Sequence, residues 1–156
     1  LLDESLLELD RFRIEEGKSI EKDLRERIGN IQSSLEEIGQ FEEERIGRIK
    51  DRIRSSLMQL ENENTDENRF EQEILYYIEK LDLNEEKVRL KKHCTYFIET
   101  IEKEENNGKK LGFISQEIGR EINTLGSKAG DARIQRIVVM MEDELEKIKE
   151  QVLNVL

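Results

Sequence analysis

Apolar side chains in the first part of the chain recur at alternating steps of three and four residues. The series begins at Leu6 and ends at Leu60, and its regular part includes Ile20, Leu24, Ile28, Ile31, Leu35, Ile38, Ile46, Ile49 and Ile53. This spacing places one apolar stripe along a helix and is typical of a heptad-like seam that packs on a partner. Residues 1–62 are therefore predicted to form a coiled-coil-like segment, as one helix or as two with a bend near residues 39–41. One continuous helix would be about 80 Å long.

Residues 66–156 repeat the helical period in shorter blocks. The polar segment 61–68 precedes them and predicts a turn, with Thr65 or Asp66 as the cap of the next helix. Asp131 is the expected cap of the last helix, after a break at Ala129-Gly130. The expected helices are residues 66–81, 84 to about 105, 109–128 and 131–155. No segment alternates as a strand would, so the predicted fold is all-α, an elongated bundle of long antiparallel helices.

The composition supports long helices and narrows the class of protein. The 156 residues include no proline, only 35% are hydrophobic and 40% are charged, which suits helices that each bury a single stripe. The single cysteine, Cys94, cannot form an internal disulfide, and no apolar run is long enough to cross a membrane. We therefore expect a cytoplasmic protein. Because Leu1 already lies inside the helical pattern, we expect a fragment of a longer protein.

The net charge of −11 argues against a simple nucleic-acid clamp, because phosphate binding requires lysine and arginine. The charge is unevenly distributed. Residues 107–156 carry eight basic and eight acidic side chains, so the whole excess of negative charge lies in residues 1–106. If the chain contacts RNA, the last third is the better candidate.

The helix expected at residues 109–128 carries two polar rows beside its apolar face. One row consists of Gln116, Arg120, Asn123 and Ser127, and the other of Glu117, Glu121, Thr124 and Lys128. The carboxylates of Glu117 and Glu121 lie one turn apart and can reach one hard cation such as Mg²⁺ or Mn²⁺. A pair of this kind is also common on a solvated helix face. The row of amide and hydroxyl groups is less usual and indicates a contacted surface.

His93 is the only histidine and lies at the edge of the apolar stripe formed by Leu90, Cys94 and Phe97. A histidine there is often a packed or capping residue. Imidazole is also the side chain best suited to exchange protons near neutral pH. Because the helices are expected to be antiparallel neighbours, His93 can converge with the polar rows of residues 109–128.

Residues 108–128 read Gly-Lys-Lys-Leu-Gly-Phe-Ile-Ser-Gln-Glu-Ile-Gly-Arg-Glu-Ile-Asn-Thr-Leu-Gly-Ser-Lys. This run resembles the signature of the YicC/YloC family of bacterial endoribonucleases, which reads roughly GRKLDFLxQEMNREANTxGSK. Shorter matches occur at residues 13–17 (R-E-x-E-G in the family), 84–93 (S-E-E-x-x-R-L-x-x-H) and 146–154 (E-K-I-R-E-Q-V-Q-N). The chain departs from the pattern at Gly112, where the family has Asp, at Gly119, where it has Asn, and at residues 155–156. The change at Gly112 removes one possible metal ligand.

The resemblance implies the C-terminal part of a protein about twice this length, with the N-terminal domain absent here. It implies a divalent-metal-dependent (Mn or Mg) endoribonuclease acting on single-stranded RNA, and a homo-oligomer, expected to be a hexamer. Under this hypothesis the catalytic residues are His93, Glu117, Arg120 and Glu121. Glu117 and Glu121 are the metal ligands, and the RNA-binding residues are Gln116, Asn123, Ser127 and Lys128. The fragment alone is expected to be inactive or poorly active. The alternative is a non-catalytic helical oligomerisation or adaptor module.

Overall fold

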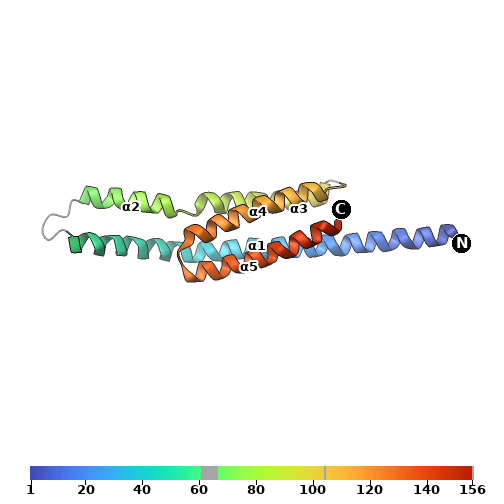
Figure 1. Cartoon of the computed structure of the whole chain (residues 1–156), viewed down its shortest axis with the longest axis horizontal. Helices are drawn as coiled ribbons and strands as arrows, with labels where there is room; N and C mark the ends of the chain where they lie inside the picture. The colour runs from blue at the N-terminus through green and yellow to red at the C-terminus, as the bar shows by residue number, and fades with distance from the viewer. Residues whose placement is uncertain (61–66, 104, 156) are drawn as a thin grey trace.

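The computed structural model describes residues 1–60, 67–103 and 105–155, which form five helices and no strand (Figure 1). The helices are α1 (Leu2–Leu60), α2 (Glu67–Leu81), α3 (Asn84–Lys103), α4 (Gly108–Ala129) and α5 (Ala132–Val155). Successive long helices run in opposite directions, except that α2 and α3 follow one another along the same line. The prediction of an all-α, elongated bundle is confirmed.

Helix α1 runs from Leu2 to Leu60 without a break. The bend considered near residues 39–41 does not occur, because no proline interrupts the helix and Gly39 and Gly47 are accommodated inside it. Of the expected turn at residues 61–68, residues 61–66, which include the expected caps Thr65 and Asp66, lie outside the described residues, as do the side chains of Leu57 and Leu60. Residues 67 and 68 belong to α2 and not to the turn.

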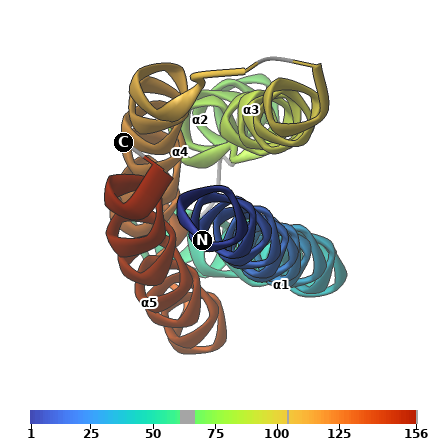
Figure 2. The same ribbon diagram turned by 90° about the vertical axis from the view of Figure 1, so that its right-hand side faces the viewer.

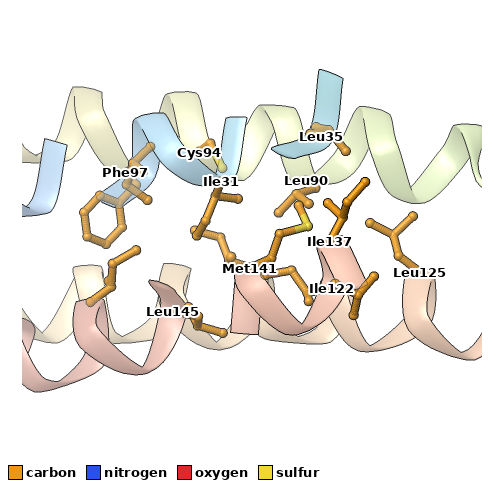
Figure 3. Close-up of a cluster of buried hydrophobic side chains, with 14 of the residues drawn as sticks. Ile31, Leu35, Leu90, Cys94, Phe97, Ile122, Leu125, Ile137, Met141 and Leu145 are labelled. Atoms are coloured by element: carbon orange, nitrogen blue, oxygen red, sulfur yellow. The ribbon is translucent and has the colours of Figure 1, made fainter. Parts of the chain in front are cut away.

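The core lies between the four helices α1, α3, α4 and α5, which Figure 2 shows end-on. The middle of α1 packs on α5 and α3, and α4 packs on α3 and α5. Each of these four helices contributes one stripe of buried side chains, among them Ile31 of α1, Phe97 of α3, Ile122 of α4 and Met141 of α5 (Figure 3). Burial of this kind contributes roughly 1.5–3 kcal/mol for each large side chain. The stripes are those that the helical period of the sequence predicts.

Cys94 belongs to this core and has no exposed surface. Burial raises the pKa of its thiol to about 12, because a thiolate would lose its hydration there. The thiol is therefore neutral at physiological pH and acts as a small packing residue, as the sequence indicates.

The start of α1 extends beyond the rest of the bundle (Figure 1), and residues 1–19 are all exposed. This segment includes large apolar side chains, with Leu6 54% and Phe12 63% exposed. The predicted seam is therefore buried within this chain only from about Leu24 to Ile38. Among the helices described, none is long and apolar enough to cross a membrane.

Two of the connections between helices depend on left-handed backbone conformations. Gly130 ends α4 with φ 56°, and Asn106 has φ 54° before α4 begins. Asp131 then caps α5, because its Oδ1 accepts hydrogen bonds from the backbone N–H groups of Arg133 (2.8 Å) and Ile134 (3.4 Å). The break at Ala129-Gly130 and the cap at Asp131 are confirmed.

Arg45 belongs to α1, but its guanidinium reaches the ends of two other helices. The residue is 4% exposed. Its Nε donates to the Ala129 carbonyl at 2.6 Å, and its Nη2 donates to the carbonyls of Lys128 (3.0 Å) and Leu81 (2.8 Å). Carbonyls at a helix C-terminus have no partner within the helix. Arg45 therefore provides hydrogen-bond donors for carbonyl groups at the C-terminal ends of both α2 and α4.

Candidate functional site

Helices α3 and α4 pack side by side and connect their charged residues in a chain of ion pairs. Lys128 Nζ lies 2.7 Å from Glu86 Oε1, and Arg89 Nε lies 2.9 Å from Glu121 Oε1. Arg89 also lies 3.7 Å from Glu86 and pairs with Glu85 one turn earlier in α3. The order of groups along the interface is thus Lys128, Glu86, Arg89 and Glu121.

The two carboxylates that pair across α3 and α4 in this network are buried. The side chain of Glu86 is 3% exposed and that of Glu121 is 7% exposed, so each depends on its cation for stability. The hydrogen bond to Glu121 raises the pKa of the Arg89 guanidinium. Among the described residues, Oε2 of Glu86 has no hydrogen-bond partner. The network therefore orders the interface and leaves one carboxylate oxygen unpaired.

A groove opens next to this network, where α3 meets the start of α4. Its volume is about 590 Å³ and its walls are mostly apolar. The residues that line it are His93, Tyr96, Asn106, Lys109, Lys110, Phe113, Ile114 and Glu117. His93 is half-buried at this position. The groove thus brings the only histidine and one of the two predicted acidic residues to the same place.

The outer row of α4 lies on the exposed face of the helix. Gln116, Arg120, Asn123 and Ser127 are all exposed. The hydroxyl of Ser127 donates to the Asn123 carbonyl at 3.0 Å. The guanidinium of Arg120 lies 3.7 Å from the carboxylate of Glu117 and is 73% exposed. This row is therefore accessible from solvent, and only Arg120 connects it to the groove.

The predicted metal ligands Glu117 and Glu121 both belong to ion pairs. Glu121 accepts a hydrogen bond from Arg89, and Glu117 faces Arg120. Among the side chains that the structure describes, no three acidic, histidine or cysteine residues are grouped so that they could hold one ion. Because a divalent cation needs several oxygen ligands, the described donors do not form a complete metal site.

Sequence reasoning placed the two rows of α4 on the faces where they lie, but it missed their partners. Glu86 and Arg89 belong to the family-like motif at residues 84–93, but the motif does not indicate that they pair with α4. A signal is present in the spacing, because Glu86 lies one turn before Leu90 and Arg89 directly precedes it, so both border the stripe that meets α4. Phe113 lies on the polar side of its helix, which indicates an exposed ring, but the sequence does not show that this ring borders a groove. For Tyr96, helical spacing favours packing at the edge of the core over stacking on a base, whereas its ring is exposed and lines the groove.

The two glycines that depart from the signature differ in the space around them. A Cβ at Gly112 would meet no atom within 4 Å outside its own helix, whereas a Cβ at Gly119 would lie 3.0 Å from Cδ2 of Leu145. The loss of an aspartate at position 112 is therefore not required by packing. At position 119, glycine permits the close approach of α4 and α5.

Comparisons with known proteins identify the family of this chain. A family model described as "Endoribonuclease YicC-like, C-terminal" matches residues 38–156. The chain is 35% identical to a "Probable endoribonuclease YicC" of Clostridioides difficile strain 630, over 99% of this chain and 53% of the relative. It is 30% identical to a protein of the same name from Haemophilus influenzae, over 97% of this chain and 53% of the relative. The chain thus spans about half the length of these curated relatives, and it belongs to the endoribonuclease YicC-like family, whose C-terminal region it contains.

Proposed function

We propose that this chain is the C-terminal helical part of an endoribonuclease that cuts single-stranded RNA with a divalent metal ion. In this proposal the face formed by α3 and α4 meets the RNA. The observation that carries it is the groove in which His93 and Glu117 lie together, next to the ion-paired Arg89 and Glu121. The two relatives are named probable endoribonucleases, which supports cleavage of RNA as the activity.

The accessible residues of this face suit the steps of phosphodiester cleavage. His93 would exchange a proton with an RNA oxygen in the groove. Arg120 is exposed and only loosely paired with Glu117, so it can turn toward a phosphate. Gln116 and Asn123 offer exposed amide groups that can orient the strand. Lys128 forms an ion pair with Glu86. Its main contribution is therefore to hold α3 and α4 together, and a contact with phosphate would be secondary.

The carboxylates of Glu117 and Glu121 provide at most part of a metal site. Each already faces an arginine, and the described residues nearby add no third acidic ligand. If a cation participates here, its other ligands come from RNA phosphates or from parts of the protein outside this chain. The roles above therefore concern proton transfer, phosphate binding and positioning by the residues of this chain.

The proposal is tested by substitutions at the groove in the full-length protein. We expect His93→Ala to reduce the rate of RNA cleavage by roughly 100-fold or more, because general acid–base catalysis commonly contributes about 10²–10⁴-fold. Glu117→Gln and Glu121→Gln are expected to lower cleavage and to raise the Mn²⁺ concentration needed for it. The measurement is cleavage of a labelled single-stranded RNA over a range of Mn²⁺ concentrations.

Arg136→Gln serves as the control for charge at an exposed position, because Arg136 is exposed on α5. It should leave the cleavage rate unchanged, whereas Arg120→Gln should reduce it. Undiminished, metal-dependent cleavage by both glutamate variants would remove Glu117 and Glu121 from the site. Absence of cleavage by the wild-type protein under all metal conditions would contradict the proposal.

A second candidate function is assembly, as a helical oligomerisation module that forms homo-oligomers, with a hexamer the expected size. The observation that favours it is the exposed start of α1, where Leu6, Phe12 and Ile14 lie uncovered. Large exposed apolar surfaces often mark protein interfaces. The two candidates are compatible, because helices can assemble the particle while another face meets RNA.

Sedimentation of this chain, combined with a cleavage assay, separates the two candidates. We expect the chain to self-associate and to cleave RNA poorly with or without Mn²⁺. Replacing Leu6 and Phe12 with serine should shift the chain toward the monomer. If the chain sedimented as a monomer and cleaved RNA at the full rate, the start of α1 would have no role in assembly.

A further inference from the structure

The groove between α3 and α4 has the features of a stacking site for a flat ring. Tyr96 contributes one aromatic ring from α3 and Phe113 another from α4, and these residues are 43% and 61% exposed. Its volume of about 590 Å³ falls within the range of about 300–1,000 Å³ typical of small-molecule sites. Two accessible rings on an apolar wall provide the surface that nucleobases use for stacking.

The charges at the groove favour a nucleotide as the occupant. Lys109 and Lys110 line it, and Nζ of Lys110 lies 5.0 Å from the centre of the Tyr96 ring. Glu117 is the one acidic side chain among the lining residues. The groove is thus basic on a chain whose net charge is −11. Phosphate groups would be attracted to this position and repelled from most of the remaining surface.

We propose that the groove receives one unpaired RNA base, which stacks on Tyr96 and Phe113 while its phosphate lies near Lys109 and Lys110. This inference rests on the proposed function and adds the way in which the substrate is recognised. A base within an A-form duplex is paired and stacked, so it cannot enter such a groove. Because His93 lines the same groove, a bound base brings its own ribose and phosphate next to the imidazole.

The test is binding of RNA by the full-length protein in EDTA, so that metal-dependent cleavage is prevented. The probe is a 12-nucleotide single-stranded RNA with one 2-aminopurine, whose fluorescence falls when the base stacks on an aromatic ring. We expect Tyr96→Leu and Phe113→Leu each to weaken binding by roughly tenfold, in line with the loss of one stacked base. Both variants should also lose the decrease in 2-aminopurine fluorescence that the wild-type protein causes.

Tyr76→Leu is the matched control, because Tyr76 is an exposed tyrosine on α2, outside the groove. It should bind the RNA like the wild-type protein. Tyr96→Phe keeps the ring and should restore both binding and the fluorescence change. Circular dichroism checks that each variant is folded, and since both rings are substantially exposed, we expect no loss of helix.

The possible outcomes separate this inference from the proposed function. Wild-type binding to single-stranded RNA that is unchanged in both leucine variants would overturn the stacking site and leave the proposed function intact. If Tyr96→Leu and Phe113→Leu weakened the binding of a duplex of the same sequence by as much, the stacking site would also be overturned, because the groove would then not select unpaired bases. Loss of self-association in sedimentation, with RNA binding unchanged, would assign the groove to a protein contact. No RNA binding by the wild-type protein would overturn both proposals.

Discussion

Arg45→Met is expected to lower the free energy of unfolding of this chain by about 3 kcal/mol. Three carbonyls at the ends of α2 and α4 accept hydrogen bonds from the buried guanidinium, and methionine can replace the aliphatic stem but none of the donors. A hydrogen bond to a charged group contributes about 1.5–3 kcal/mol, and the carbonyls left without a partner add a desolvation cost. The total is discounted because water can reach the carbonyls of Leu81 and Lys128. Urea denaturation followed by circular dichroism measures the change.

Arg52→Met is the control for this experiment, since Arg52 is an exposed arginine two turns further along α1. We expect it to change stability by less than about 0.5 kcal/mol, as is usual for surface substitutions. Burial lowers the pKa of the Arg45 guanidinium, and the negative charges of Glu42, Asp131 and Asp82 act against this change. Equal stability of the two variants would mean that these hydrogen bonds contribute nothing beyond what water provides.

Lys128→Met is expected to lower the free energy of unfolding by about 2 kcal/mol. It removes the nearest cation from Glu86, whose carboxylate is 3% exposed. Removal of one member of a buried ion pair commonly costs about 3–5 kcal/mol, but Lys128 is partly exposed and Arg89 still faces Glu86, so the smaller value applies. The measurement is the same urea denaturation at neutral pH.

The double variant Glu86→Gln with Lys128→Met shows whether the pairing is the cause. Once the carboxylate is neutral, loss of the lysine should cost much less, so the two changes should not be additive. The double variant also distinguishes the two roles considered for Lys128. If Lys128→Met weakened RNA binding but left stability unchanged, the main role of the lysine would be to contact RNA.

The helices themselves could be predicted from the sequence to within a few residues. In α4 the period of 3.6 residues places Leu111, Ile118 and Leu125 on one face, and all three are buried. The buried face of an amphipathic helix can be recognised from the spacing of apolar residues along the sequence alone. The same period placed Glu121 beside that face. It could not show that Arg89 would meet Glu121, since this contact joins residues 32 positions apart and depends on how two helices are offset.

At two residues, the sequence pattern marks an unusual position without showing the contact that explains it. Arg45 stands seven residues after Ile38, which is a seam position, so a charge there indicates a buried polar contact. Phe113 lies on the polar side of an amphipathic helix, where an aromatic side chain has no packing role. For both residues, the pattern marks the position as exceptional, and only the neighbouring helices show why.

The polar contacts along α1 have a consequence for how this long helix finds its place. Its aliphatic stripe repeats only in part, because a shift of α1 along its axis by one heptad would still place leucine or isoleucine at three of the five buried positions from Leu24 to Ile38. Arg27 and Arg45 break that repetition, since each meets a specific group on another helix, at Glu144 and at Ala129. A shifted helix would separate the Arg45 guanidinium from the carbonyls that accept its hydrogen bonds. The two arginines therefore favour the observed alignment of α1 over a shifted alignment that keeps part of the hydrophobic contact.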